Sequence, residues 1–297
     1  MSLGEPTLTL GRTLWLLSPE LVILFAGILI LGLDAIDLGR EDKGWLPYVA
    51  LMGLAGSLIA TFRLWGCNTR VLFVLSCDPF ALVVKMVALI STAIVILASD
   101  VYMRARSRHR GEFYALLLFS ALSMCLLSGA TNLIMIFLAL DFFTITLYVL
   151  TGYLRDDRRS TEAAIKYLLY GAALSAVMLF GMSWLYGLTG STDLRGIAAA
   201  LRETEYTLRP IVLPALILMV AGLGFKVAAV PFHQWAPDAY EGAPTPVTAF
   251  LSVGPKIAGF GIIVRVMLTA LPIDLKSLAT DWRALLMAMA VLTMTVG

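Results

Sequence analysis

The sequence predicts an all-α, polytopic transmembrane helix bundle. Three observations predict it: 60% of the 297 residues are hydrophobic, only 14% are charged, and long apolar stretches recur along the whole chain. A soluble domain carries about 25% charged residues, whereas a membrane-spanning helix needs about 20 mostly apolar residues. The mean hydropathy of +0.88 agrees with membrane residence. The composition therefore excludes a soluble enzyme, a disordered chain and a nucleic-acid binder of the basic-patch type.

Nine apolar stretches are long enough to be predicted as spans. They lie near residues 15–36, 46–64, 79–99, 113–129, 131–152, 162–187, 211–230, 247–270 and 283–297. The first is not a signal peptide, because no small-residue cleavage site follows its apolar run. The last stretch ends without a polar or basic flank, so we expect the sequence to be part of a longer chain.

The arginine-rich connections predict the orientation in the membrane. Short connections with excess Lys and Arg stay in the cytoplasm. Four arginines lie between residues 104 and 110, and three more at positions 155, 158 and 159. Alternation then places the N-terminus outside the inner (plasma) membrane of the cell. The long connection 189–209 is predicted outside although it carries three arginines, so it runs against the rule.

The chain shows no sequence pattern for a bound cofactor. It has no Walker A or dinucleotide glycine pattern, and its three cysteines form no CxxC metal motif. We therefore expect no metal and no cofactor in this chain. Energy for any transport would come from an ion gradient or from partner proteins.

Ionisable side chains inside the spans are functional candidates, because placing a charge there costs at least ~2.5–3.5 kcal/mol. They are Lys85, Asp141, Lys166, Lys226, Lys256 and Arg265. Lys85 and Arg265 lie near span ends, so we expect them to extend their charged groups to the interface. Lys166 has Glu162 one turn before it, so a simple helix-surface ion pair remains open.

The deeper lysines, Lys226 and Lys256, point to proton handling. A lysine in water has a pKa near 10.4, and desolvation lowers the pKa of a buried lysine by up to ~3–5 units. A buried lysine can therefore release a proton near neutral pH, whereas arginine stays charged. A purely structural pairing remains the alternative for Asp141 and Lys256, and interface contact is the alternative for Lys226.

Glycines and prolines around Lys226 predict a broken helix there. Gly222 and Gly224 precede it, prolines follow at positions 231, 237, 244 and 246, and Pro255 stands directly before Lys256. A proline inside a helix removes a hydrogen bond and bends the helix. Non-helical backbone at membrane depth is tolerated only where it lines protein or water. Ordinary proline kinks between packed helices are the alternative.

One long segment carries a family resemblance: residues 224–256, GFKVAAVPFHQWAPDAYEGAPTPVTAFLSVGPK. It closely resembles the antiporter-like N subunits (NuoN/NdhB type) of the proton-translocating NADH:quinone oxidoreductase, respiratory complex I. Residues 111–134, 137–150 and 162–172 resemble the same family. The resemblance implies two inverted five-helix repeats, each with a broken helix. It divides the chain into a three-helix segment (1–110), the first antiporter-like repeat (111–270) and the truncated start of the second (271–297).

The resemblance also implies roles for four of the charged residues. Asp141 matches the acidic residue of the fifth helix, where the family usually has glutamate, and Lys166 matches the lysine that pairs with it. Lys226 matches the lysine that holds the pumped proton, and Lys256 matches the relay lysine after it. The spans as predicted put Asp141 and Lys166 at different depths, which leaves their contact in doubt. His233 and Glu241 are secondary candidates, for which loop-fixing hydrogen bonds are the plainer explanation.

The implied function is that of a proton-translocating membrane subunit of an enzyme complex, coupled to electron transfer from NADH to quinone elsewhere. The resemblance implies K-, M- and J-type neighbouring membrane subunits, a redox arm and a surrounding lipid bilayer. NADH, FMN, iron–sulfur clusters and quinone are expected in partner subunits. Two alternatives stay open: a stand-alone Mrp-type cation/proton antiporter subunit, and a non-pumping membrane scaffold.

Overall fold

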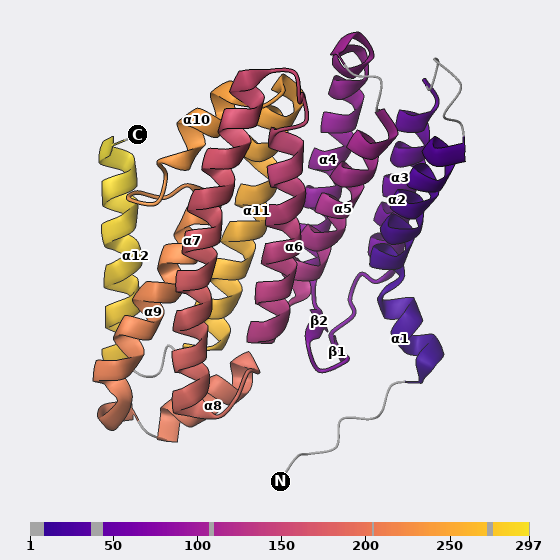
Figure 1. The fold of residues 1–297 in the computed structure, drawn as a ribbon. Coiled ribbons are helices and arrows are strands. Elements are labelled where there is room, and N and C mark those ends of the chain that lie inside the picture. Colours follow the sequence, from indigo (N-terminus) through magenta and orange to yellow (C-terminus); the bar gives the residue numbers. More distant parts are fainter. Residues whose placement is uncertain (1–8, 37–43, 107–109, 204, 272–275, 297) are drawn as a thin grey trace.

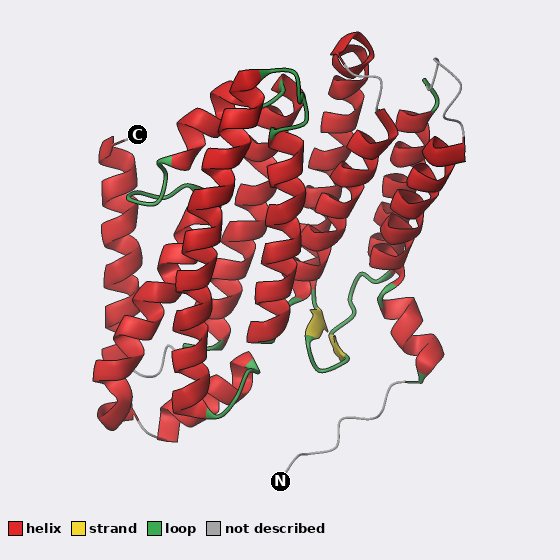
Figure 2. Cartoon of the chain, viewed as in Figure 1, coloured by secondary structure: helices red, strands yellow, loops and turns green. Residues whose placement is uncertain are grey.

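The computed structural model describes residues 9–36, 44–106, 110–203, 205–271 and 276–296. Long helices lie side by side along a common direction, with short elements at their two ends (Figure 1). Helices make up nearly all of the described chain (Figure 2). The predicted all-α transmembrane helix bundle is therefore confirmed.

Eight helices in the described residues are long and apolar enough to cross a membrane. These eight helices are α2 (Ser18–Ile36), α3 (Leu46–Arg63), α4 (Pro79–Arg106), α5 (Arg110–Gly129), α6 (Leu133–Thr151), α7 (Arg158–Thr189), α9 (Glu205–Val227) and α11 (Thr245–Thr269). They match the first eight predicted spans. The ninth predicted span falls on α12 (Lys276–Val296). The chain is a multi-pass membrane protein.

Capping residues explain where the longest helix begins and ends. The carboxylate of Asp157 accepts a hydrogen bond from the Arg159 backbone N–H at 3.0 Å, which satisfies one of the free donors at a helix start. Gly190 ends the helix in the left-handed conformation, with φ of 66°, a backbone shape that glycine adopts without strain. Helix α7 therefore extends beyond the predicted span 162–187 at both ends.

Short elements close one end of the bundle. They are α1 (Leu10–Leu16), the strands β1 (Thr69–Val71) and β2 (Leu75–Cys77), and α8 (Leu194–Glu203) (Figure 1). The two strands form an antiparallel hairpin that the sequence pattern did not predict. Arg70 of this hairpin pairs with Asp193 at 2.5 Å, so the hairpin is tied to the start of α8. We call this end of the bundle the hairpin end.

Both arginine-rich connections lie at the opposite end of the bundle. The last turns of α4 and α6 and the first turns of α5 and α7 lie there, together with the short helix α10 (Trp235–Gly242) (Figure 1). The prediction that these two connections share one side agrees with this arrangement. We call this end the arginine-rich end.

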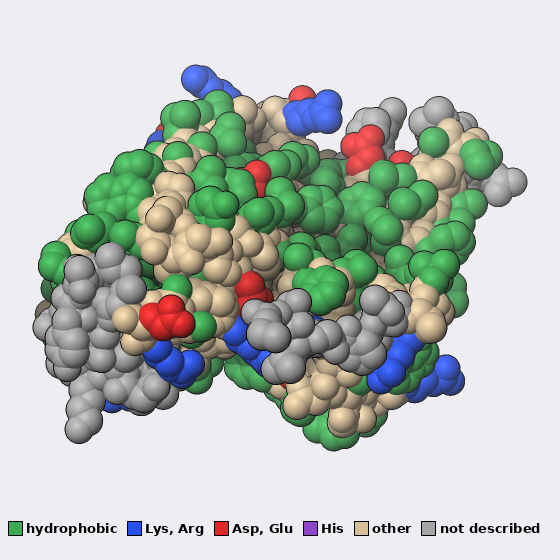
Figure 3. Space-filling model, turned by 90° about the horizontal axis from the view of Figure 1, so that it is seen from below, with side chains coloured by type: hydrophobic (Ala, Val, Ile, Leu, Met, Phe, Trp, Pro, Cys, Tyr) green, Lys and Arg blue, Asp and Glu red, His purple; other side chains and the backbone are tan. Residues whose placement is uncertain are grey.

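Apolar side chains cover the outside of the bundle. Seen from the hairpin end, hydrophobic side chains occupy much of the surface and charged ones are scattered (Figure 3). Phe25, Leu97 and Leu169 are more than half exposed on three different helices, as expected for side chains that face lipid. Inside, α5 is the most enclosed span, with 78% of its most apolar stretch buried.

Small residues let α7 and α9 approach closely. A Cβ atom added at Gly181 would lie 2.7 Å from the Ala215 carbonyl oxygen, and one added at Gly222 would lie 2.9 Å from the Leu174 carbonyl oxygen. Interfaces between membrane helices are enriched in such small residues, because they allow backbones to pack. The contact fixes where the end of α9 lies within the bundle.

Candidate functional site

Helix α9 ends inside the bundle, directly after Lys226. Its last helical residue is Val227, and Ala228 takes the left-handed conformation with φ of 56°. The Ala229 N–H donates to the Gly224 carbonyl oxygen at 2.8 Å, which closes the turn. Residues 228–234 then run to α10 without forming a helix (Figure 1). The predicted broken helix near Lys226 is confirmed.

The ammonium group of Lys226 is buried beside this break, with 4% of the residue exposed. Its Nζ donates a hydrogen bond to Thr144 Oγ1 on α6 and lies 5.0 Å from the centre of the Phe225 ring. The Thr144 hydroxyl itself donates to the Leu140 carbonyl oxygen at 2.5 Å, so its lone pairs face the ammonium. An ammonium carries three donors, and Thr144 is its one hydrogen-bond acceptor among the described residues.

Asp141 lies one helical turn from Thr144, on the same side of α6. It is half-buried and is the carboxylate that acts electrostatically on Lys226. No ion pair within 4.0 Å joins Asp141 to a lysine in the part of the chain that is described. Asp141 therefore influences Lys226 across a gap and does not bind it directly.

Lys166 does not pair with Asp141 in this structure, in keeping with the different depths that the predicted spans give the two residues. Its Nζ lies 2.9 Å from Glu162 Oε1 and 3.2 Å from Asp238 Oδ2, and its side chain is 41% exposed. The reason is the packing of α10 against α7, which brings Asp238 to the face of α7 that carries Lys166. The ion pair with Glu162 that the sequence left open is present.

An aromatic cluster lies between Lys226 and Lys256. Trp235 of α10 stacks on Tyr167 with ring centres 4.4 Å apart, and it also contacts Phe225 and Tyr240 at 5.2 and 6.0 Å. The Trp235 indole N–H donates to the Phe225 carbonyl oxygen at 3.0 Å. Lys256 Nζ lies 5.5 Å from the Tyr240 ring centre, within the range of a cation–π contact. The two lysines thus flank one cluster of rings.

Gly259 brings α11 against the end of α9. A Cβ atom added there would lie 2.8 Å from Val227 Cγ1 and 3.5 Å from Lys226 Cβ. Gly259 lies one helical turn after Lys256, so the two lysines are on neighbouring helices at similar heights. The structure therefore gathers Asp141, Lys226 and Lys256 around the end of α9, and it leaves Lys166 at the surface.

The two secondary candidates lie on either side of α10. His233 is half-buried in the turn before it, and its buried Nδ1 has no hydrogen-bond partner among the described residues. The loop-fixing hydrogen bond expected from His233 is therefore absent at that nitrogen. Glu241 is exposed near the end of the helix, away from the buried lysines.

Two charged residues expected at the interface are buried ion-pair partners, so that expectation is wrong for both. Lys85 Nζ lies 2.5 Å from Glu20 Oε1 of α2, and both side chains are 6% exposed. The guanidinium of Arg265 donates to both oxygens of Asp78, at 2.9 and 3.0 Å, and to the Ser128 carbonyl oxygen at 3.1 Å. Glu20 and Asp78 lie at the ends of apolar spans, and no local sequence signal marked either of them as the partner of a buried cation.

The Asp78 carboxylate is fully satisfied by hydrogen bonds. Burial alone would raise the pKa of Asp78, but the hydrogen bonds from Arg265, Ser76 and the Ala81 N–H, with the Arg265 charge, hold that pKa below its usual value. Ser76 Oγ donates at 2.6 Å and the Ala81 N–H at 2.8 Å. The group stays ionised and joins α4 to α11.

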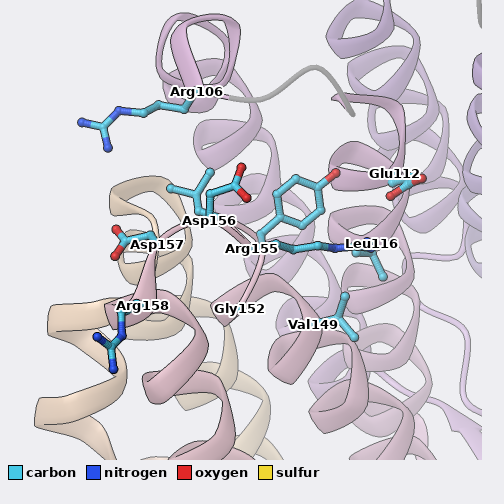
Figure 4. A pocket seen from close by; sticks show the side chains of 11 residues that line it. Arg106, Glu112, Leu116, Val149, Gly152, Arg155, Asp156, Asp157 and Arg158 are labelled. Carbon is cyan, nitrogen blue, oxygen red and sulfur yellow. The ribbon is translucent and has the colours of Figure 1, made fainter.

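A hollow of about 840 Å³ at the arginine-rich end is separate from the lysine site. It lies over the ends of α4 to α7, and Arg155 extends across it toward Leu116 whereas Arg106 points away (Figure 4). None of the buried lysines lines it. Within the described ranges, no three His, Cys, Asp or Glu side chains gather as metal ligands.

Comparison with known proteins places the chain in a family. Residues 130–297 match the family model described as NADH:quinone oxidoreductase/Mrp antiporter, transmembrane. The chain is 41% identical over 288 residues to NAD(P)H-quinone oxidoreductase subunit 2 of Gloeothece citriformis, which covers 96% of this chain and 54% of that protein. It is 40% identical over 280 residues to NADH-quinone oxidoreductase subunit N of Trichlorobacter lovleyi, covering 94% and 56%.

Comparison with a solved structure supports the same family. A chain of respiratory complex I from Thermus thermophilus with bound aureothin superposes with a TM-score of 0.70 at 31% identity, covering 84% of this chain and 53% of that one. The chain spans about half the length of the curated relatives it matches. The resemblance drawn from the sequence is thus confirmed, and the chain belongs to the NADH:quinone oxidoreductase/Mrp antiporter transmembrane family.

Proposed function

We propose that this chain moves protons as part of a membrane subunit of an NAD(P)H- or NADH:quinone oxidoreductase. The observation that carries the proposal is the buried Lys226 ammonium at the end of the broken helix α9, with one hydroxyl acceptor. Buried lysines at a helix break are a recurrent feature of ion-transport sites. The chain contributes to an enzyme complex by translocation, and electron transfer takes place in partner subunits.

In the proposed mechanism Asp141 controls the charge on Lys226. A closer approach of the Asp141 carboxylate stabilises the ammonium form, and a retreat favours release of the proton. The released proton passes by water around the aromatic cluster to Lys256, because no direct hydrogen bond joins the two lysines. Moving one charge against 100 mV costs about 2.3 kcal/mol, which quinone reduction in partner subunits supplies. Lys166 joins α7 to α10 through Asp238 and so positions the relay.

The names of the relatives support a redox complex as the setting. Both curated relatives are named as quinone oxidoreductase subunits, and the matching solved structure is a respiratory complex I. We assign NADH, FMN, iron–sulfur clusters and quinone to partner subunits, and K-, M- and J-type subunits as membrane neighbours. We place the complex in the plasma membrane with the hairpin end, and the N-terminus, outside.

Replacing Lys226 tests the proposal. Lys226→Ala and Lys226→Arg are expected to leave the assembled complex present on a native gel and to abolish proton pumping in membrane vesicles. Arg63→Ala, which removes an exposed cation at the end of α3, is the matched control and should pump normally. Unchanged pumping in both Lys226 variants would refute the proposed role.

The two alternatives give different results in the same preparation. In a non-pumping scaffold, Lys226→Ala would remove the complex from the native gel and would leave the pumping of any residual complex unchanged. In an Mrp-type antiporter, purification of the chain would recover no flavin or iron–sulfur proteins. Co-purification of such proteins would support the redox complex.

A further inference from the structure

The hairpin end contains a buried lysine–carboxylate pair that the proposed relay does not use. Glu20 lies in the first turn of α2 and Lys85 lies two turns into α4. Their charged atoms are 2.5 Å apart, and only 6% of each side chain is exposed. The pair joins α2 to α4.

The hydrogen bonding of this pair is incomplete. Glu20 Oε2 is buried and has no hydrogen-bond partner among the described residues. Lys85 has three N–H donors, and Glu20 Oε1 is the acceptor that the structure gives them. A buried ion pair is stable only when its remaining lone pairs and protons are satisfied. The free oxygen is therefore a place where an additional proton can bind.

The neighbouring ion pair at the same end provides a contrast. Arg265 is buried and Asp78 is half-buried, and both Asp78 oxygens have two donors each. Arginine does not release its proton in proteins, so that pair holds a fixed charge. The pair formed by Glu20 and Lys85 is built from two groups that can each exchange a proton. The two pairs thus differ in chemistry although they lie at the same end of the bundle.

The thiols of Cys125 on α5 and Cys77 on β2 are the other titratable groups that act on Lys85. Cys77 belongs to the hairpin, so the pair lies close to the end of the bundle.

Buried hydroxyl groups lie on both sides of α6. Thr144 accepts from Lys226 on one side of α6. Two residues further, on the other side of α6, Thr146 Oγ1 lies 2.9 Å from Ser120 Oγ on α5. All of these hydroxyls are buried, and a hydroxyl can both accept and donate a proton. Helix α6 therefore presents proton-carrying groups toward α9 and toward α5.

We propose that Glu20 and Lys85 form a second proton-holding site of this chain, which exchanges protons with the hairpin end. An arriving proton forms an O–H bond at Glu20 Oε2, so that a neutral carboxylic acid stands beside the Lys85 ammonium. The same O–H bond breaks when the proton leaves, and the ion pair is restored. The site changes between net charges of zero and plus one, and no electron is transferred. This inference rests on the proposed proton-translocating function.

Glu20→Gln is the decisive variant, because it keeps the size of the side chain but removes the carboxylate oxygen that takes up the proton. In membrane vesicles that contain the assembled complex, we expect Glu20→Gln to lose proton pumping while the complex remains on a native gel, and Lys85→Arg, which keeps the positive charge beside Glu20, to retain it. Asp78→Asn is the matched control: it is expected to lower the amount of complex but not the pumping of each complex that assembles. Wild-type pumping in Glu20→Gln would overturn the inference.

An infrared measurement keeps the inference testable through Glu20→Asp, which retains a carboxyl group, if Glu20→Gln does not assemble. Turnover of the wild-type complex should change a carboxylic-acid C=O band that is missing in Glu20→Gln and moved in Glu20→Asp, and identical difference spectra would overturn the inference. Lys226→Arg separates the two proposals. Loss of pumping there with normal pumping in Glu20→Gln refutes the second site alone, and normal pumping in both refutes the proposed function as well.

Discussion

Replacing Thr144 tests how the chain controls the charge on Lys226. Thr144→Val keeps the shape of the side chain and removes the oxygen that accepts from the ammonium. The hydroxyl also bonds to the Leu140 carbonyl of its own helix, a local bond whose loss costs the helix little. The main effect therefore falls on Lys226.

The size of the effect follows from the strength of the lost bond. A hydrogen bond to a charged group contributes about 1.5–3 kcal/mol, and each 1.36 kcal/mol changes an equilibrium tenfold. The ratio of ammonium to amine at Lys226 should fall by about 10- to 150-fold. The proton-pumping profile should accordingly move toward lower pH by about one to two pH units.

The assay is proton pumping by the assembled complex in vesicles, measured across the pH range. Thr144→Ser restores the acceptor oxygen and should return the profile to that of the wild type. A merely structural role for Thr144 would lower pumping equally at all pH values. A Thr144→Val profile at the wild-type position, or equal defects in the Val and Ser variants, would refute the reasoning.

Three further predictions concern packing, acid stability and thiol reactivity. Gly181→Ala should destabilise the chain by about 1–3 kcal/mol, because its Cβ meets the α9 backbone. Gly187→Ala, with open space around it, should be neutral. Thermal unfolding in detergent measures both variants. The pKa of Asp78 is lowered on folding, so its contribution to stability is complete above the unfolded pKa near 3.9 and is lost as pH falls through the folded pKa. The stability advantage of the wild type over Asp78→Asn, measured by unfolding at several pH values, should therefore vanish at low pH. A constant advantage would contradict this. Burial, with the neighbouring Cys67 thiol, raises the pKa of Cys77 to about 12, so alkylation followed by mass spectrometry should label Cys67 first; faster labelling of Cys77 would contradict it.

The sequence predicted the spans and the break at Lys226 because both depend on local composition. Apolar runs of the right length have few alternatives in a bilayer, and glycine and proline mark helix breaks wherever they lie. The partners of buried charges depend on which helices become neighbours, and no local pattern contains that information. Asp238 was therefore not recognised as a partner of Lys166, nor Glu20 as the partner of Lys85.

The hairpin of β1 and β2 shows the same limit at the surface. Its turn uses Leu72 and Phe73 with positive φ values of 52° and 58°, where glycine or asparagine would have signalled a turn. Contacts with Ala130 and Asp193 hold the strands in place. Tertiary contacts thus impose a backbone shape that the residues themselves do not favour.

The two cations of helix α11 are held differently. Arg265 is hydrogen-bonded to Asp78 and to the Ser128 carbonyl, while the Lys256 ammonium, nine residues earlier, lies over the face of the Tyr240 ring. At a rise of 1.5 Å per residue, this gives an arm of about 13 Å. A pivot of about 5° at the guanidinium would carry the lysine by about 1 Å, enough to make or break a hydrogen bond. Helix α11 thus joins a fixed charge, on an arginine that never loses its proton, to a lysine whose contacts a small tilt would change.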